Sequence, residues 1–177
     1  MRNTKVRSLS LAALFTALTA VCAQIQIPLP MIPLNLALFS VYLCGALLGA
    51  KYGAASMGVY LLLGLVGAPV FTGMGAGPAI LFGKTGGYIL GYIFAAMITG
   101  LWRERWGFSF GRLCLGMAAG TLACYALGTA YFMWIAHMNL LTSLAYCVFP
   151  FLPGDAVKIA LAAWLAVRLA KTPLLRG

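Results

Sequence analysis

The chain has 177 residues, of which 63% are hydrophobic and 8% charged, with a mean hydropathy of +1.00 and a formal net charge of +10. A soluble domain carries about 25% charged residues, so this composition excludes an ordinary soluble protein and predicts an integral membrane protein. The basic residues punctuate apolar runs, which is typical of membrane topology and argues against a nucleic-acid-binding patch. The five cysteines are scattered without a CxxC motif, so they predict neither a metal site nor a disulfide framework.

Six apolar segments approach the length of about 20 residues that a membrane-spanning helix needs. In chain order they cover residues 9–27, 34–49, 54–71, 83–102, 113–136 and 153–169. The first follows a basic start, as in a signal peptide, but no small-residue cleavage site follows it, so we interpret it as a membrane helix. The prediction is an all-α integral membrane protein in which residues 1–177 form a single six-helix transmembrane bundle.

The basic residues support this number of helices. With six spans, one side of the membrane receives Arg2, Lys5, Arg7, Lys51, Arg103, Arg105, Arg112, Arg168, Lys171 and Arg176. Five or seven spans would scatter these residues over both sides. The positive-inside rule then predicts that this side is cytoplasmic and that both termini lie there.

Three charges remain at the predicted outer ends of helices: Lys84, Asp155 and Lys158. Asp155 and Lys158 are three residues apart and therefore neighbours on one helix face. A charge in the hydrocarbon core costs at least about 2.5–3.5 kcal/mol, so charges kept there usually have a function. The three predict an outward-facing site for a small ligand with one carboxylate and polar donors. A purely structural Asp155–Lys158 pair at a helix start is the alternative.

The segment QIQIPLPMIPLN joins the first two predicted helices, and its prolines keep it extended. It is either a stiff connector or a rigid lid over an outward pocket. If it is a lid, Gln24 and Asn35 are the side chains that can supply uncharged hydrogen bonds to a ligand.

The segment FTGMGAGPAILFGKTGGY joins the third and fourth predicted helices and resembles a phosphate-binding loop. The spacing between Gly77 and the sequence Gly83-Lys84-Thr85 is one residue too long for that motif, so we predict a ligand-covering loop without a nucleotide. Tyr88 follows Lys84 by one helical turn on the same face, where it can stack on a ligand or form a hydrogen bond with it.

Small residues recur every four positions in several predicted helices. They are Gly45 and Gly49 in the second, Gly83, Gly87, Gly91 and Ala95 in the fourth, and Gly116, Gly120, Cys124 and Gly128 in the fifth. Such stripes let helices approach closely, so we predict tight packing within the bundle. Ala13 and Ala17 form a similar strip on the first helix, which serves either packing or the docking of a partner membrane subunit.

The sequence contains no ATPase motif, no zinc signature and no Ser-His-Asp set, and its single histidine argues against metal catalysis. We therefore predict no catalytic residues and no metal. The chain can bind and orient a solute, but active transport would need a partner that supplies energy.

Four stretches together resemble the BioY family, the biotin-binding S component of energy-coupling factor (ECF) transporters: QIQIPLP, LCGALLGAKYGAASMGVYLLLGLVGAPVF, GKTGGYILGYIFAA and PFLPGDAVKIALA. The resemblance implies a six-helix S-component fold in the bacterial plasma membrane, with biotin captured at the outer face. It also implies a membrane T component and two ATPase subunits as partners. These ATPases would bind the ATP, so the chain itself would need no cofactor.

The resemblance also bears on individual residues. It associates the positions of Asp155, Lys158 and Lys84 with the ligand pocket, and Thr85, Gly86 and Tyr88 belong to the same GxTGGY motif. The family pattern has Pro at the position of Lys84 and Thr-Leu-Gln where this chain has Asn35-Leu36-Ala37. The predicted substrate site is Asp155, Lys158, Lys84, Tyr88, Thr85, Gly86 and Asn35. The predicted partner-docking residues are Ala13 and Ala17.

Two other hypotheses stay open. One is an S component for another carboxylated vitamin, with the same fold and partners. The other is a small membrane enzyme or assembly factor that uses Asp155 as acid or base, which the lack of a second acid near the site disfavours. The sequence also leaves open which side chain binds the carboxylate of biotin and which binds its ureido ring.

Overall fold

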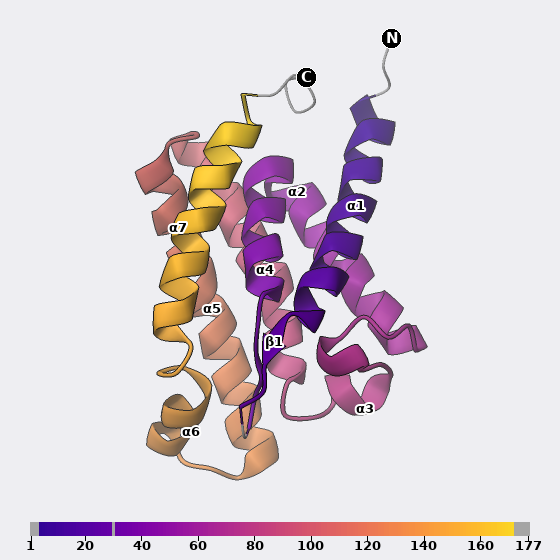
Figure 1. Cartoon of the computed structure of the whole chain (residues 1–177), viewed down its shortest axis with the longest axis vertical. Coiled ribbons are helices and arrows are strands. Elements are labelled where there is room, and N and C mark those ends of the chain that lie inside the picture. Colours follow the sequence, from indigo (N-terminus) through magenta and orange to yellow (C-terminus); the bar gives the residue numbers. More distant parts are fainter. Residues whose placement is uncertain (1–3, 30, 172–177) are drawn as a thin grey trace.

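The structure is a computed structural model that describes residues 4–29 and 31–171. Within these residues the long helices are α1 (Thr4–Gln24), α2 (Ala37–Val66), α4 (Gly86–Trp106), α5 (Phe110–Ala136) and α7 (Leu152–Leu169). The short elements are β1 (Gln26–Ile27), β2 (Leu34–Asn35), the 3-10 turn η1 (Thr72–Met74), α3 (Pro78–Leu81) and α6 (Leu140–Cys147). The long helices form a bundle, and the short elements gather at one of its ends (Figure 1).

The predicted second and third helices are the two arms of α2, which bends sharply at Gly49. Gly49 has φ 81° and ψ 179°, in a region that glycine adopts without steric cost. A Cβ atom on Gly53 would lie only 3.2 Å from the Cα of Gly45, whereas eight residues of straight helix span about 12 Å. The chain therefore reverses at Gly49. The connection that we expected over several residues is reduced to a single glycine.

The bend is also held from outside α2. The carboxylate of Glu104, in the last turn of α4, accepts a hydrogen bond of 2.9 Å from the backbone N–H of Ala50. This N–H lies at the start of the second arm of α2, where backbone donors have no partner within the helix. One of the two acidic side chains of the protein thus caps a helix at the end of the bundle opposite to β1, α3 and α6.

Among the described residues, three helices can cross a membrane by length and hydropathy, and a fourth span is added if α6 and α7, bent by 52°, form one span. This count takes the two arms of α2 as one helix. The start of α1 and the end of α7 lie at the same end of the bundle, at the top of Figure 1, as an even number of crossings requires. The cytoplasmic location of that end stays a prediction from the basic residues.

The small residues of α4 and α5 pack directly against each other, which confirms the predicted role of these stripes. A Cβ atom on Gly91 would lie 2.7 Å from the sulfur of Cys124, and one on Gly120 would lie 2.8 Å from the carbonyl oxygen of Ala95. Gly83 is different, because α4 begins only at Gly86 and Gly83 precedes it.

Buried hydroxyl groups connect α1 to α2. The Thr19 hydroxyl lies 2.9 Å from that of Ser40, and the Thr16 hydroxyl donates to the carbonyl oxygen of Ser56 at 2.9 Å. This contact buries one face of α1 and leaves Ala13 and Ala17, on another face, exposed.

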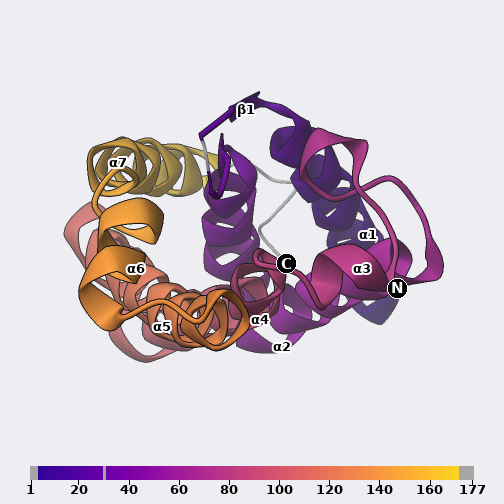
Figure 2. The same cartoon turned by 90° about the horizontal axis from the view of Figure 1, so that it is seen from below.

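The proline-rich connector and the glycine-rich loop both lie at the end of the bundle seen in Figure 2, together with α6. The connector forms a short antiparallel hairpin in which Gln26 pairs with Asn35 and Ile27 with Leu34. This end is opposite to the start of α1 and the end of α7 (Figure 1), so these segments cover the other end of the bundle.

Candidate ligand-binding site

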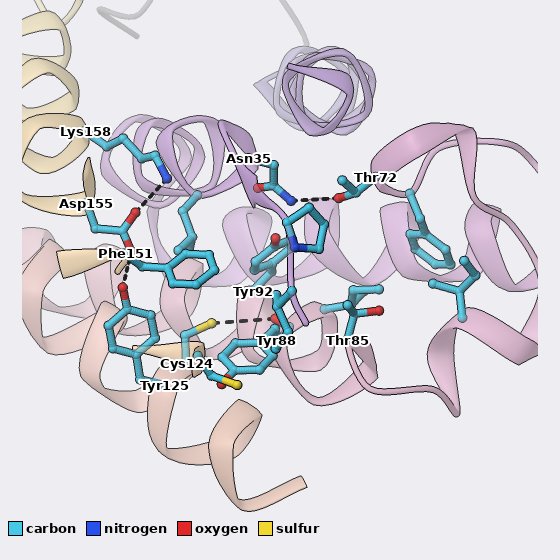
Figure 3. Close-up of a pocket in the computed structure, with 17 residues that line it drawn as sticks. Asn35, Thr72, Thr85, Tyr88, Tyr92, Cys124, Tyr125, Phe151, Asp155 and Lys158 are labelled. Carbon is cyan, nitrogen blue, oxygen red and sulfur yellow. Dashed lines mark hydrogen bonds and ion pairs between the residues drawn. The ribbon is translucent and has the colours of Figure 1, made fainter. Parts of the chain in front are cut away.

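A cavity opens at the end of the bundle where β1, α3 and α6 lie. Its empty volume is about 790 Å³, including space open to solvent. The side chains that surround it come from the connector hairpin, the glycine-rich loop and helices α2, α4, α5 and α7, as well as from the end of α6 (Figure 3). Sequence segments that are far apart therefore meet at one site.

One pole of the cavity is ionic. The ammonium nitrogen of Lys158 lies 2.6 Å from Oδ1 of Asp155, and both residues are buried, with exposed fractions of 7% and 2%. The hydroxyl of Tyr125, on α5, donates a hydrogen bond to Oδ2 of Asp155. Both carboxylate oxygens thus have a partner within the protein, which is the condition under which a buried ion pair is tolerated.

The opposite pole is polar but uncharged. The side-chain amide of Asn35 donates to the hydroxyl of Thr72 at 2.7 Å, and its oxygen accepts from the backbone N–H of Ala37 at 3.1 Å. Thr85 also lines the cavity on this side (Figure 3). The hydrogen bond between Asn35 and Thr72 connects the connector hairpin to the glycine-rich loop.

Aromatic side chains line much of the cavity, and Tyr88, Tyr92 and Phe151 lie between the two poles (Figure 3). Tyr88 and Tyr92 come from successive turns of α4, and Phe71 and Phe151 come from the glycine-rich loop and the start of α7. The Tyr88 hydroxyl lies 3.0 Å from that of Thr129, which fixes the ring against α5. Flat aromatic faces with little conformational freedom suit a rigid, mostly apolar group.

Five of the seven predicted site residues line this cavity: Asp155, Lys158, Tyr88, Thr85 and Asn35. Gly86 does not line it, because this residue is buried at the start of α4 against the carbonyl group of Leu81. Lys84 does not line it either, and its side chain is exposed. The cavity lining therefore holds one cation and one anion, and Lys84 does not join the other two charges within it.

Sequence reasoning missed several lining residues. Tyr125 is separated from Asp155 by 30 positions and Thr72 from Asn35 by 37, so no local pattern connects these pairs. Gln24 was a candidate for direct hydrogen bonds with a ligand, but its side chain binds the backbone of the glycine-rich loop instead. Only the three-dimensional arrangement reveals these partners.

A bundle of apolar helices with a mostly apolar cavity and a buried ion pair defines a membrane protein that binds a small solute. The BioY family model matches residues 1–173, so the chain belongs to the BioY family.

Two relatives and one solved structure agree with this assignment. The chain is 38% identical to the biotin transporter BioY of Thermotoga maritima over 94% of this chain and 97% of the relative. It is 39% identical to the probable biotin transporter BioY of Pyrococcus horikoshii over 93% and 97%. The fold matches the crystal structure, at 2.1 Å, of the S-component for biotin from an ECF-type ABC transporter, with a TM-score of 0.91, 28% identity and coverage of 99% and 97%. These three are transport proteins, not enzymes.

Proposed function

We propose that the chain is a membrane S component that captures biotin from the outer face of the cell membrane for uptake. The observation that carries this proposal is the cavity, which lies in a fold that matches a biotin S-component over 99% of the chain. Biotin has a neutral ureido ring fused to an apolar thioether ring and an aliphatic tail that ends in a carboxylate. A cavity with two polar poles and an aromatic middle complements such a molecule.

We further propose that the ureido ring faces Asp155 and Lys158. The pair is neutral as a unit, so a second carboxylate beside Asp155 would be repelled, whereas a ureido group can donate to the carboxylate and accept from the ammonium. The carboxylate of biotin then lies toward Thr85 and the N-terminus of α4, where the helix dipole favours an anion. Lys84 directly precedes Thr85 and is exposed, and we propose that it binds this carboxylate at the mouth of the cavity.

Binding of biotin to the purified protein tests the proposed function. We expect tight binding in isothermal titration calorimetry, and other vitamins that carry a carboxylate should not displace labelled biotin at equal concentration. Displacement by another vitamin with higher affinity would identify the chain as an S component for that vitamin. Turnover of a substrate by the isolated chain would instead favour an enzyme.

The orientation of biotin is tested with a neutral ligand. Lys84→Ala is expected to weaken biotin binding by about two- to five-fold, as for an exposed ion pair of about 0.5–1 kcal/mol, and to leave binding of biotin methyl ester unchanged. Asp155→Asn should weaken both ligands by about ten-fold or more. If Lys158→Ala weakens the binding of biotin more than that of its methyl ester, and Lys84→Ala weakens both equally, the carboxylate lies at the ionic pole.

We also propose that the exposed strip of Ala13 and Ala17 on α1 docks the membrane T component, through which two ATPase subunits supply energy. An exposed small-residue surface lets the backbone of a partner helix approach closely. Both alanines are exposed, while the opposite face of α1 is fixed to α2, so the strip is available to another chain.

A bulky residue in this strip is expected to prevent assembly but not binding. Ala17→Leu should reduce biotin uptake by cells and co-purification of the T component by at least about ten-fold, while the affinity of the isolated chain for biotin stays within about two-fold. Ala126→Leu, at an exposed alanine of α5, is the matched control and should leave both unchanged. Normal uptake by Ala17→Leu would argue against this docking surface.

A further inference from the structure

Gln24, the last residue of α1, binds the backbone of a loop that is distant in sequence. Its Nε2 group donates to the carbonyl oxygen of Phe71 at 3.0 Å, and its Oε1 atom accepts from the backbone N–H of Met74 at 2.8 Å. The same Nε2 group lies 3.1 Å from the carbonyl oxygen of Ala20 within α1. Both ends of the amide are thus used, although Gln24 does not line the cavity.

The segment that Gln24 holds is a tight turn with an unfavourable backbone. Phe71 and Gly75 exchange both of their backbone hydrogen bonds, at 3.0 and 3.2 Å. Gly73 and Met74 between them have φ values of 68° and 59°. For methionine this left-handed region is uncommon, so the conformation at Met74 depends on contacts from outside the turn.

The same turn forms part of the cavity wall. Phe71 is 1% exposed, and its ring meets that of Tyr60 edge-on with centroids 5.6 Å apart. Thr72 accepts the hydrogen bond of Asn35 at 2.7 Å, and both Phe71 and Thr72 line the cavity. A displacement of the turn therefore moves an aromatic wall and the uncharged pole together.

We infer that Gln24 is a positioning residue for the ligand, which sets affinity through the turn that carries Phe71 and Thr72. This inference rests on the proposed function in taking biotin as the ligand. Gln24 acts on the uncharged pole and not on the ion pair, since its hydrogen bonds outside α1 end on the turn. The loss of affinity caused by removing the Gln24 amide should therefore be coupled to substitutions at Thr72 and independent of substitutions at Asp155.

A mutant cycle with purified protein tests this inference. We expect Gln24→Met to weaken biotin binding by about ten-fold, mainly through faster dissociation, and Gln24→Glu, which keeps an acceptor for Met74, to have a smaller effect. Combined with Thr72→Val, Gln24→Met should add little to the effect of Thr72→Val alone. Combined with Asp155→Asn, the two fold-changes should multiply. Lys51→Met, at an exposed lysine next to the Gly49 bend of α2 and away from the cavity, is the control and should bind biotin like the wild type.

Hydrogen exchange supplies a measurement that does not depend on biotin. In the ligand-free protein, Gln24→Met should increase exchange of the backbone amides in segment 70–76 and leave α5 unchanged. Unchanged exchange in this segment would overturn the inference, as would unchanged biotin affinity or fold-changes that multiply with Thr72→Val. A wild type that does not bind biotin would count against the proposed function, and the exchange result would still decide whether Gln24 holds the turn.

Discussion

Replacement of Lys158 by methionine is expected to destabilise the protein by about 3 kcal/mol and to abolish tight biotin binding. Lys158 and Asp155 form a buried pair with 2.6 Å between nitrogen and oxygen. Removal of one partner leaves the other charge buried without compensation, which typically costs about 3–5 kcal/mol. Thermal unfolding in detergent measures the stability, and calorimetry with biotin measures the binding.

The double variant Asp155→Asn with Lys158→Met separates the structural role of the pair from its binding role. With neither charge present, the penalty for an unpaired ion disappears, and stability should return to within about 1 kcal/mol of the wild type, since apolar replacement of a whole buried pair is often neutral. Biotin binding should stay absent. Recovery of binding would assign the pair a purely structural role. Lys84→Met, at an exposed lysine, is the stability control and should change unfolding by less than about 0.5 kcal/mol.

The ion pair could be predicted from sequence because its chemistry conflicts with its surroundings. A charge in an apolar membrane helix is costly whatever the fold. Asp155 and Lys158 could therefore be recognised as candidate site residues from the sequence alone. Their spacing of three residues placed them on one helix face, and the structure pairs them. The reversal of the chain near Gly49 was also predictable. The apolar sequence around it is longer than one membrane span needs, and Lys51 is a charge that is costly inside the hydrocarbon core.

The rest of the cavity could not be predicted, because it is assembled by packing between distant segments. Tyr125 reaches Asp155 from α5, a helix whose small residues pack closely against α4. Lys84 shows what its position in the sequence left open. Its location at the outer end of a helix suggested convergence with the other two charges, but its side chain is exposed and outside the cavity lining. A position at the end of a helix specifies how deep a side chain lies in the membrane, but it does not specify the direction in which the side chain points.

Gly91→Val is expected to disrupt both packing and binding, because α4 and α5 have no room for a side chain at this position. A Cβ atom on Gly91 would lie 2.7 Å from the sulfur of Cys124 and 3.0 Å from its Cα atom. The Cα atom belongs to the backbone of α5, so the helices themselves must separate. Such overpacking typically costs about 1–3 kcal/mol. Thermal unfolding in detergent should show this loss.

The same substitution should weaken biotin binding by about ten-fold or more, because the cavity wall spans the two helices. Tyr88 lies one turn before Gly91 on α4 and Tyr125 follows Cys124 on α5, so separation of the helices moves one ring away from the other. Gly58→Val is the matched control, since a Cβ atom on Gly58 would meet nothing within 4 Å. It should leave stability within about 0.5 kcal/mol and affinity unchanged. Wild-type affinity in Gly91→Val, despite lower stability, would mean that the ligand contacts one of the two helices alone.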